Sequence, residues 1–561
     1  MIDSANNISS KVDLVVDICI VGAGAAGISI ALELSGKGFQ VLLLEAGTSQ
    51  EDPATQALYA GEVADEKMHS PTDKYRHRRF GGSTAIWGGR CMPFDPIDLE
   101  PRSYVPFSGW PIGYSDIAPF FPKANNYLEA GRYEYDADTA FNPLAAPMVR
   151  GFNSERVRTN GLERFSCPTN MAARYQGRLQ AASDVRVLLE ANCTGIRLNS
   201  EGNAVDHLDV ATLAGKQFKV RAKDVVLAIG GLETARLLLA SNDVHPQGVG
   251  NANDVVGRYY MCHIAGNVGS LVVKGGVDNV RHGYEISPDG VYCRRRLQLT
   301  EDTQRQLGVG NMVARLHFPK ITDPAHRSGV LSGLFLARNF ISYEYGKRLK
   351  DGEGDSVGRY MRHLWNVISG PIDTLAFLTH WVAKRTLAVR KFPSVILRNK
   401  SNRFSLEVHA EQIPRPDSRV SLLPSKDALG MPQIKVDWRY SKEDIDTVRK
   451  TLRTFSEEFA RSGVATFDFD EKSLEKDLLR FGAYGGHHVG TARMGADPKT
   501  SVVDKNCAVH GLPNLHIASS AVFPTSSQAN PTLMIVAMAL RLASHIQAKD
   551  CQARQEYGVA V

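Results

Sequence analysis

The sequence predicts an α/β protein, α+β overall, and three features of the chain lead to this prediction. The first is a strand–turn–helix–strand pattern between residues 16 and 47. The second is a change, between residues 266 and 438, to short strand-like runs without the regular alternation of strand and helix. The third is a long amphipathic helix that precedes a glycine-rich C-terminal region. Because 561 residues exceed what one hydrophobic core normally serves, we expect two domains.

The N-terminal pattern has the order of a Rossmann-like unit. Apolar run 18–21 leads to the turn GAGAAG at residues 22–27, and a second apolar run, 41–44, ends at Glu45. In such a unit the first glycine permits the turn, the second lets the backbone approach a pyrophosphate, and the third lets helix and strand pack closely. The helix N-terminus offers N–H groups to phosphates. A carboxylate at Glu45 can bind a ribose diol, so the unit predicts a dinucleotide other than NADP.

Composition and charge narrow the class of protein. Apolar residues make up 43% of the chain and charged residues 22%, as in globular proteins, and the net charge is only +6. We expect no nucleic-acid partner, since no stripe rich in lysine and arginine is present. The N-terminal stretch lacks the apolar core of a signal peptide, and the eight cysteines are scattered. We therefore expect a cytoplasmic location, reduced thiols and no metal site.

A second glycine-rich segment, residues 78–90, reads RRFGGSTAIWGGR and is a poor helix and a poor strand. It suits a loop pressed against a flat ligand, although an ordinary glycine loop is the alternative. Residues 185–220 predict a small antiparallel meander, and residues 224–231 predict a buried strand that reaches a glycine pair, with a helix over 233–239.

The middle of the chain predicts a second, mainly antiparallel sheet with helical insertions. The runs with strand composition are 291–299, 312–318, 404–408, 419–422 and 434–438. Ser441, with Asp444 three residues later, predicts the start of a helix that has one apolar face.

Segment 364–392 carries two tryptophans and ends in four basic residues. No apolar run in the chain is long enough to span a bilayer. The segment fits a buried helix pair with a solvated basic flank. It also fits a helix at a membrane surface or a partner protein, because aromatic and basic residues suit the headgroup boundary.

Chemically distinctive residues concentrate near the C-terminus. Residues 485–495 read GGHHVGTARMG, and residues 523–532 read FPTSSQANPT. Asn530 precedes Pro531 at the start of a final apolar helix, a position that proline tolerates and that keeps Asn530 extended.

These motifs together resemble the glucose–methanol–choline (GMC) flavoprotein oxidoreductases. The resemblance covers nearly the whole chain and includes GAGAAG, GGSTAIWGG, SGWPI, GGLETARLL, HHVGTARMG and FPTSSQANPT. It implies an FAD cofactor, and the middle segments look most like the branch that oxidises sugars. It also implies a discontinuous FAD-binding domain, residues 1–265 and 485–561, and a substrate-binding domain, residues 266–484.

The resemblance gives His487 the role of catalytic base and Asn530 that of its partner. A neutral imidazole can take the hydroxyl proton of an alcohol while hydride leaves to the flavin N5. An amide can hold the same hydroxyl without competing for the proton. His488, His263, His409, His510 and His516 are expected to be structural.

The residues expected to contact FAD come from the glycine turns, the end of the second strand and the C-terminal motif. They are Gly22, Gly24, Ala25, Ala26, Gly27, Glu45, Ala46, Gly81, Gly82, Ser83, Thr84, Trp87, Gly88, Gly89, Cys193, Gly230, Ser519, Asn530, Pro531 and Thr532. Some sugar oxidases of the family carry, near the tryptophan, a histidine that bonds covalently to the flavin. Ile86 stands there in this chain, so we expect FAD to be bound non-covalently.

The expected reaction is oxidation of a hydroxyl group of a sugar, glycoside or polyol to a ketone or aldehyde. An external electron acceptor, such as oxygen, a quinone or a redox protein, would reoxidise the flavin. Two alternatives remain: the same fold acting on a non-sugar alcohol, and a lyase in which FAD is structural.

Overall fold

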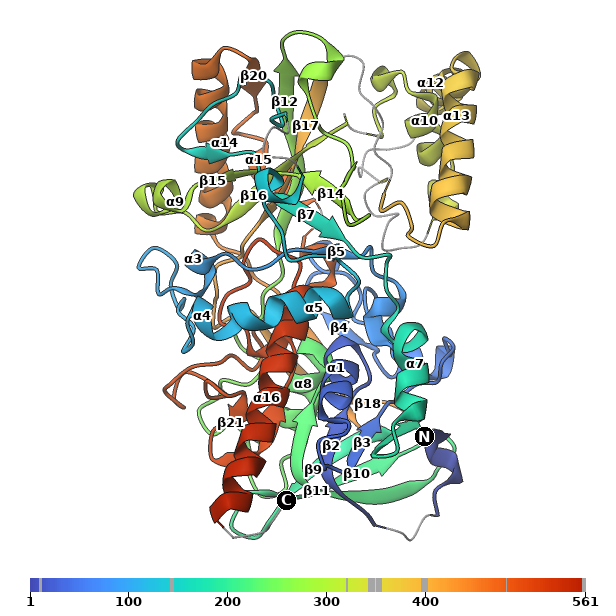
Figure 1. Ribbon diagram of the computed structural model, residues 1–561, viewed down its shortest axis with the longest axis vertical. Helices are drawn as coiled ribbons and strands as arrows, with labels where there is room; N and C mark the ends of the chain where they lie inside the picture. The colour runs from blue at the N-terminus through green and yellow to red at the C-terminus, as the bar shows by residue number, and fades with distance from the viewer. Residues whose placement is uncertain are drawn as a thin grey trace.

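The computed structural model describes residues 1–9, 13–141, 146–318, 321–341, 349, 356–394, 402–480 and 482–556. In Figure 1 one sheet with its helices and both chain termini occupies the lower half, and a second sheet occupies the upper half. Helices α10 (Gly329–Leu336), α12 (Val357–Ser369) and α13 (Pro371–Trp381) lie beside the second sheet, at the upper right of the view.

The lower sheet has the order β1-β8-β3-β2-β11-β10-β9, with β22 beside β11 and β21 beside β22. Its strands are β1 (Ile2–Ser4), β2 (Leu14–Val21), β3 (Val41–Leu44), β8 (Val185–Leu189), β9 (Asn192–Leu198), β10 (Val205–Ala211), β11 (Gln217–Leu227), β21 (Ala508–Val509) and β22 (Leu512–Ile517). Pairing is parallel from β1 to β11 and antiparallel from β11 to β9. The predicted meander is therefore correct for β9 to β11 and wrong for β8, which pairs with β1 and β3.

The predicted strand–turn–helix–strand unit is confirmed as β2, α1 (Ala25–Leu34) and β3. Gly22 turns the chain at φ +100°, and a Cβ there would lie 2.6 Å from the carbonyl oxygen of Ala228. A Cβ on Gly27 would lie 1.9 Å from the carbonyl oxygen of Gly22, so α1 can approach β2 only with glycine at this position. The long C-terminal helix α16 (Thr532–Glu556) packs against α1.

The upper sheet has the order β20-β12-β17-β16-β15-β6 and is antiparallel throughout, as predicted. Its strands are β6 (Val157–Arg158), β12 (Ile264–Val273), β15 (Leu297–Leu299), β16 (Met312–His317), β17 (Arg403–Ala410) and β20 (Ala465–Asp468). Helix α14 (Lys442–Ser462) packs on it and begins at the predicted capping box of Ser441 and Asp444. Its residues Leu452 and Phe455 are fully buried, as the apolar face predicts.

Two smaller sheets combine segments from distant parts of the chain. One joins β5 (Arg90–Cys91), β7 (Leu162–Phe165), β14 (Tyr292–Arg295) and β13 (Glu285–Ile286), and the other joins β4 (Gly61–Val63), β19 (Pro432–Asp437) and β18 (Arg419–Lys426). All strands of the lower sheet come from outside residues 266–484, whereas β18 and β19 come from inside that range, and β19 pairs with β4, which lies outside it. The proposed domain boundaries stay a prediction.

The remaining helices are shorter than α14 and α16. They are α2 (Pro53–Ala57), α3 (Pro96–Leu99), α4 (Tyr114–Ile117), α5 (Phe121–Tyr127), α6 (Ala137–Ala140), α7 (Met171–Ala181), α8 (Gly230–Ala240), α9 (Glu301–Leu307), α10 (Gly329–Leu336), α12 (Val357–Ser369), α13 (Pro371–Trp381) and α15 (Leu474–Leu479). Within the described part of the chain, no helix combines the length and the apolar character that crossing a bilayer requires.

Segment 364–392 forms the predicted helix pair, within α12 and α13, but the pair is not buried. The side chains of Trp365 and Ile372 are 67% and 82% exposed. The interpretation of this segment as a buried pair is wrong, because hydrophobicity alone does not say whether another part of the chain covers a helix.

Candidate active site

One large cavity, with a volume of about 460 Å³, is lined by residues from the lower sheet and from the C-terminal motif. This size is within the range of small-molecule and cofactor sites, roughly 300–1,000 Å³. The sequence-predicted residues that line it are His487, Gly22, Gly24, Ala25, Ala26, Glu45, Ala46, Gly82, Ser83, Thr84, Trp87, Gly88, Cys193, Gly230, Ser519, Asn530, Pro531 and Thr532. Gly27, Gly81 and Gly89 do not line it. The cavity thus brings together segments that lie more than 500 residues apart in the chain.

No contact within the protein requires the residue at position 24 to be glycine. A Cβ added to it would meet no atom within 4 Å, and its backbone lies in the extended region with φ −85°. It nevertheless lines the cavity and is the N-cap of α1, without a side chain to cap that helix. The open space at Gly24 fits a ligand that must approach the backbone, and the uncapped N–H groups of α1 suit a phosphate.

Glu45 follows β3 at the cavity wall. Its Oε2 accepts a hydrogen bond from the N–H of Ala23 at 2.9 Å, and its Oε1 accepts one from the N–H of Gly47 at 2.9 Å. Burial raises the pKa of Glu45, against the effect of these two N–H donors. The two bonds hold the carboxylate at the rim of the glycine turn, where each oxygen keeps a lone pair for a further donor.

The second glycine-rich segment packs directly on the first. The N–H of Gly81 donates to the carbonyl oxygen of Ala23 at 2.9 Å, and a Cβ on Gly82 would lie 3.2 Å from the Cα of Gly24. Trp87 is anchored by a bond from its Nε1 to the carbonyl oxygen of Thr169 at 2.8 Å. Ile86 lines the cavity beside it. Gly81 therefore has a structural role, which places the rest of the loop against the cavity.

His487 lies beside His263 because of a local backbone pairing. Met261 and Val489 form an isolated antiparallel bridge, and His263 and His487 each lie two residues from that bridge, on the same side of it. The Nδ1 atoms of the two rings are 2.9 Å apart. On its other side, Nε2 of His487 is 3.2 Å from Nδ2 of Asn530, an atom that can only donate.

These hydrogen bonds decide which ring nitrogen carries the hydrogen when His487 is neutral. Because the amide of Asn530 donates to Nε2, the ring proton is on Nδ1 and is donated to Nδ1 of His263. Burial lowers the pKa of His487 well below its ordinary value, and the neighbouring His263, Arg90 and His488 lower it further. Burial also lowers the pKa of His263, to about 4. His487 is therefore neutral at pH 7, with a lone pair on the nitrogen next to Asn530.

The sequence analysis treated His263 and His409 as ordinary structural histidines, and the structure places both next to His487. The ring of His409 stacks on that of His263 with centroids 4.3 Å apart, and its Nδ1 donates to the carbonyl oxygen of Gln528 at 2.6 Å. One nitrogen from each of the three histidines lies within 4.8 Å of the others, a spacing that can hold a metal ion. Nδ1 of His487 and Nδ1 of His409 each make a hydrogen bond, whereas Nε2 of His263 is buried without one.

Asn530 is held by the buried segment that precedes it. Thr525, Ser526 and Ser527 are all fully buried. Nε1 of Trp110, in the SGWPI motif, donates to Oγ1 of Thr525 at 2.9 Å, and Oγ of Ser527 donates to Asp98 at 2.6 Å. These contacts explain two motifs that sequence reasoning noted without a role. Oδ1 of Asn530 is buried without a hydrogen-bond partner, so the site has room for one more donor.

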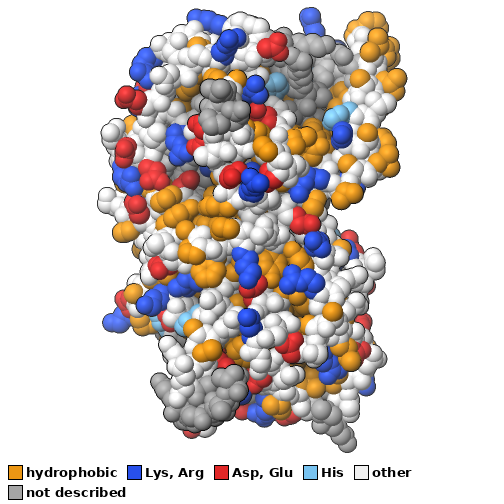
Figure 2. Space-filling model, in the orientation of Figure 1, with side chains coloured by type: hydrophobic (Ala, Val, Ile, Leu, Met, Phe, Trp, Pro, Cys, Tyr) orange, Lys and Arg blue, Asp and Glu red, His pale blue; other side chains and the backbone are white. Residues whose placement is uncertain are grey.

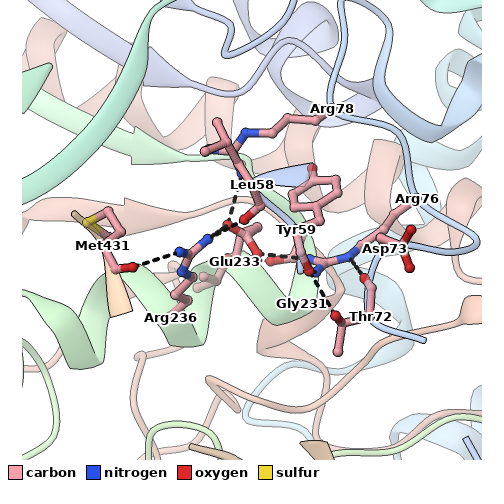
Figure 3. Close-up of polar contacts among 12 residues, drawn as sticks. Leu58, Tyr59, Thr72, Asp73, Arg76, Arg78, Gly231, Glu233, Arg236 and Met431 are labelled. Atoms are coloured by element: carbon pink, nitrogen blue, oxygen red, sulfur yellow. Dashed lines mark hydrogen bonds and ion pairs between the residues drawn. The ribbon is translucent and has the colours of Figure 1, made fainter. Parts of the chain in front are cut away.

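A buried arginine cluster in the cavity wall was missed by the sequence analysis (Figure 3). Arg76 and Arg78 each place a guanidinium nitrogen 3.0 Å from the carboxylate of Glu233, and Arg236 approaches it to 3.3 Å. The guanidinium of Arg76 also lies 3.8 Å above the ring of Tyr59. Burial raises the pKa of Glu233, but the three arginines outweigh it and hold the pKa at about 2. Only the GGLETAR motif, which contains Glu233 and Arg236, pointed to this cluster.

Comparison with known proteins identifies the family. Residues 17–298, half of the chain, match the family described as FAD dependent oxidoreductase, and residues 414–539 match that described as GMC oxidoreductase. The chain belongs to the FAD-dependent GMC oxidoreductases. This GMC oxidoreductase is accordingly an enzyme that acts on CH–OH donors, and FAD is its cofactor, as the resemblance implied.

Similar proteins cover nearly the whole chain at low identity. Paromamine 6′-oxidase of Streptomyces fradiae is 24% identical, over 95% of this chain and 92% of its own. The large subunit of fructose dehydrogenase of Gluconobacter japonicus is 22% identical, over 96% of this chain and 98% of its own. Among solved structures, pyridoxine 4-oxidase from Mesorbium loti matches with a TM-score of 0.52 and 18% identity. The match covers 95% of this chain and 99% of that one, and it shows that the two proteins share a fold.

The residues around the cavity fit FAD. The open space at Gly24 and the uncapped N-terminus of α1 suit the pyrophosphate, and Glu45 is placed for a ribose diol. Ile86, which lines the cavity, has an aliphatic side chain that cannot bond covalently to the cofactor. FAD is bound non-covalently in this enzyme.

Proposed function

We propose that this GMC oxidoreductase oxidises a hydroxyl group of a sugar, glycoside or polyol to a ketone or aldehyde. The observation that carries the proposal is the 3.2 Å contact between Nε2 of His487 and Nδ2 of Asn530, in the wall of the cavity that Gly24 also lines. It joins a proton acceptor and a hydrogen-bond donor at one point of the FAD site.

The two side chains would divide the work on the substrate hydroxyl. The hydroxyl would donate its hydrogen to Nε2 of His487 and accept a bond from the amide of Asn530, which replaces the direct contact between the two residues. His487 then takes the proton as general base, and Asn530 keeps the oxygen in place. The bound FAD supplies the acceptor for the hydride.

The sugar class is supported by the remaining cavity wall and by the relatives. Trp87, Phe165 and Tyr284 supply aromatic surface, and Arg90 supplies N–H donors for substrate oxygens. Paromamine 6′-oxidase and fructose dehydrogenase are named for sugar substrates, and C-glycoside 3-oxidase of Microbacterium trichothecenolyticum matches 21% of the chain at 36% identity.

The proposal extends to the organisation of the chain. Residues 1–265 and 485–561 bind FAD through those predicted residues, from Gly22 to Thr532, that line the cavity, and residues 266–484 cover the substrate. The electron acceptor is oxygen, a quinone or a redox protein. A cytoplasmic location is supported by the eight cysteines, all of which are free.

Anaerobic reduction of the bound flavin tests the proposal. The purified holoenzyme would be mixed with a panel of sugars, glycosides, polyols and simple alcohols while the flavin absorbance is followed. We expect a sugar or polyol to bleach the flavin, and His487→Ala to remain yellow with FAD still bound. Bleaching only by simple alcohols would contradict the sugar class. A flavin that dithionite reduces but no alcohol bleaches would favour the lyase alternative.

A further inference from the structure

Helix α12 is amphipathic with its polar face against the protein. Arg359 donates to the carbonyl oxygen of Thr322 from Nε at 2.9 Å, and Nδ1 of His363 lies 2.9 Å from Oγ of Ser332. Asn366 donates to the carbonyl oxygen of Pro324 at 2.9 Å. A surface helix normally buries its apolar stripe and exposes its polar one, and α12 does the reverse.

The outward face of α12 is apolar. Met361, Leu364, Trp365 and Ile368 are spaced i, i+3, i+4 and i+7, and their exposed fractions are 58%, 42%, 67% and 60%. This spacing places all four on one stripe of the helix. Among the described residues, no helix, strand or loop therefore covers this stripe.

Helix α13 continues the apolar surface. Ile372, Leu375 and Leu378 are more than half exposed, as are Leu387, the last residue of the π-helical turn η8 (Val382–Leu387), and Val389 beyond it. Figure 2 shows hydrophobic side chains gathered over these helices at the upper right of the molecule. We name the exposed apolar side chains of α12 and α13 the apolar ridge. Contiguous exposed apolar surface of this kind marks an interaction site.

The charge beside the ridge is positive. Residues 356–394 contain six lysines and arginines, one of which, Arg359, faces the protein, and Asp373 is the single acidic residue in that stretch of sequence. Arg362 on α12 and Lys384 on η8 are exposed. Apolar side chains with a tryptophan and a basic margin are the composition of a helix that lies in the interface of an anionic bilayer.

We propose that the apolar ridge docks this enzyme on an anionic membrane surface, with α12 and α13 lying in the headgroup region. The basic margin selects this occupant, because anionic headgroups supply the complementary charge around an apolar interior. The short segment after η8 leads to the cavity, whose wall includes Pro393 and Ser394. Docking therefore places one wall of the active-site cavity close to the membrane.

Co-sedimentation of the holoenzyme with lipid vesicles tests the proposal. One set of vesicles contains phosphatidylcholine alone, and the other contains phosphatidylcholine with phosphatidylglycerol. We expect binding to the anionic vesicles, weaker binding to the neutral ones, and a decrease in high salt. The variant Trp365→Ser with Ile368→Ser and Leu375→Ser should bind at least about tenfold more weakly, because it loses three large apolar contacts.

Two further variants separate the charge from the apolar surface. Arg362→Gln with Lys384→Gln should lower binding to anionic vesicles and leave binding to neutral vesicles unchanged. Val15→Ser with Leu213→Ser removes apolar side chains that are 74% and 40% exposed on the lower half, and should bind like the wild type. Flavin absorbance and turnover in the absence of vesicles should be unchanged in all three variants.

Three results would overturn the proposal. One is a wild-type holoenzyme that does not sediment with anionic vesicles. Another is an equal loss of binding in the control variant on the lower half. The third is a dimer in size-exclusion chromatography that the triple serine variant converts to a monomer, since the ridge would then be covered by a second copy of the chain.

Discussion

Nδ1 of His263 lies 2.9 Å from Nδ1 of His487, and this contact determines which nitrogen of His487 can take a proton. With His263 as acceptor, the hydrogen of His487 stays on Nδ1, and the lone pair stays on Nε2 beside Asn530. Without that acceptor the neutral ring can adopt the other tautomer, whose Nε2 already carries a hydrogen. His263 is therefore a positioning residue for the proposed base.

Replacement of His263 should test this role. His263→Phe removes the acceptor, and we expect the rate of flavin reduction by substrate to fall by roughly 10- to 100-fold with FAD still bound. His263→Asn, whose Oδ1 can accept the same hydrogen, should recover part of the rate. Stopped-flow absorbance measures both variants.

A matched control for this pair is His510→Phe, because His510 contacts Ser501 and does not line the cavity. It should reduce at the wild-type rate. If the Phe and Asn variants of His263 were equally slow, the role would be packing rather than acceptance of a hydrogen bond.

The low pKa of His487 predicts an unusual pH profile. Burial, His263, Arg90 and His488 hold this pKa well below 6.5, so the ring stays neutral as the pH falls through 6.5. We expect kcat/KM to remain on its plateau between about pH 8 and 6, whereas a base with an ordinary histidine pKa near 6.5 would lose about three quarters of its activity by pH 6. Initial rates with a saturating acceptor measure the profile. An acid limb centred near 6.5 would show that the ring is more solvated than the structure indicates.

Two glycines of the same turn should separate cofactor binding from folding. Gly24→Ala adds a Cβ that meets no protein atom, so the apoprotein should keep its melting temperature while FAD binds more weakly. Gly27→Ala places a Cβ 1.9 Å from a backbone oxygen and should destabilise the apoprotein itself. Thermal unfolding of the apoprotein and quenching of FAD fluorescence measure the two effects. Equal FAD affinity in Gly24→Ala and wild type would remove Gly24 from the proposed contacts.

The sequence predicts the parts of this fold that have a local code. The GAGAAG turn and its flanking apolar runs predict β2, α1 and β3, and Ser441 with Asp444 predicts the start of α14. Strand β8 was assigned to the wrong neighbours because a short apolar run does not encode its partner. The sequence also left open whether α12 is buried or lies at a surface, since burial depends on what the rest of the chain covers.

The candidate site shows the same limit. Motif residues such as His487 and Asn530 are recognisable one by one, and the structure brings them to one cavity. His263 and His409 belong to no motif, and only strand pairing brings them to His487. The arginines around Glu233 come from a loop and a helix that are more than 150 residues apart, so no pattern in the sequence links them.

Glu233 should be the most costly carboxylate to remove from the cavity wall. Glu233→Gln leaves Arg76, Arg78 and Arg236 buried together without their shared counter-ion, so we expect a loss of stability on the order of 3–5 kcal/mol. The matched control is Glu457→Gln, whose carboxylate is 62% exposed and pairs with Arg156, and which should change stability by less than about 1 kcal/mol. Chemical denaturation followed by tryptophan fluorescence measures both.

The acid side of the stability profile gives an independent test of Glu233. Its pKa is about 2 in the folded protein, below the ordinary value of 4.5 that applies to the unfolded chain. The stabilisation is therefore fully present above about pH 4.5 and is lost as the pH falls toward 2. The difference in stability between wild type and Glu233→Gln should be constant from pH 7 to 5 and become smaller below 4.5. A difference that stays constant down to pH 3 would mean that the arginines do not lower this pKa, and that the Glu233→Gln variant is destabilised through its altered hydrogen bonds alone.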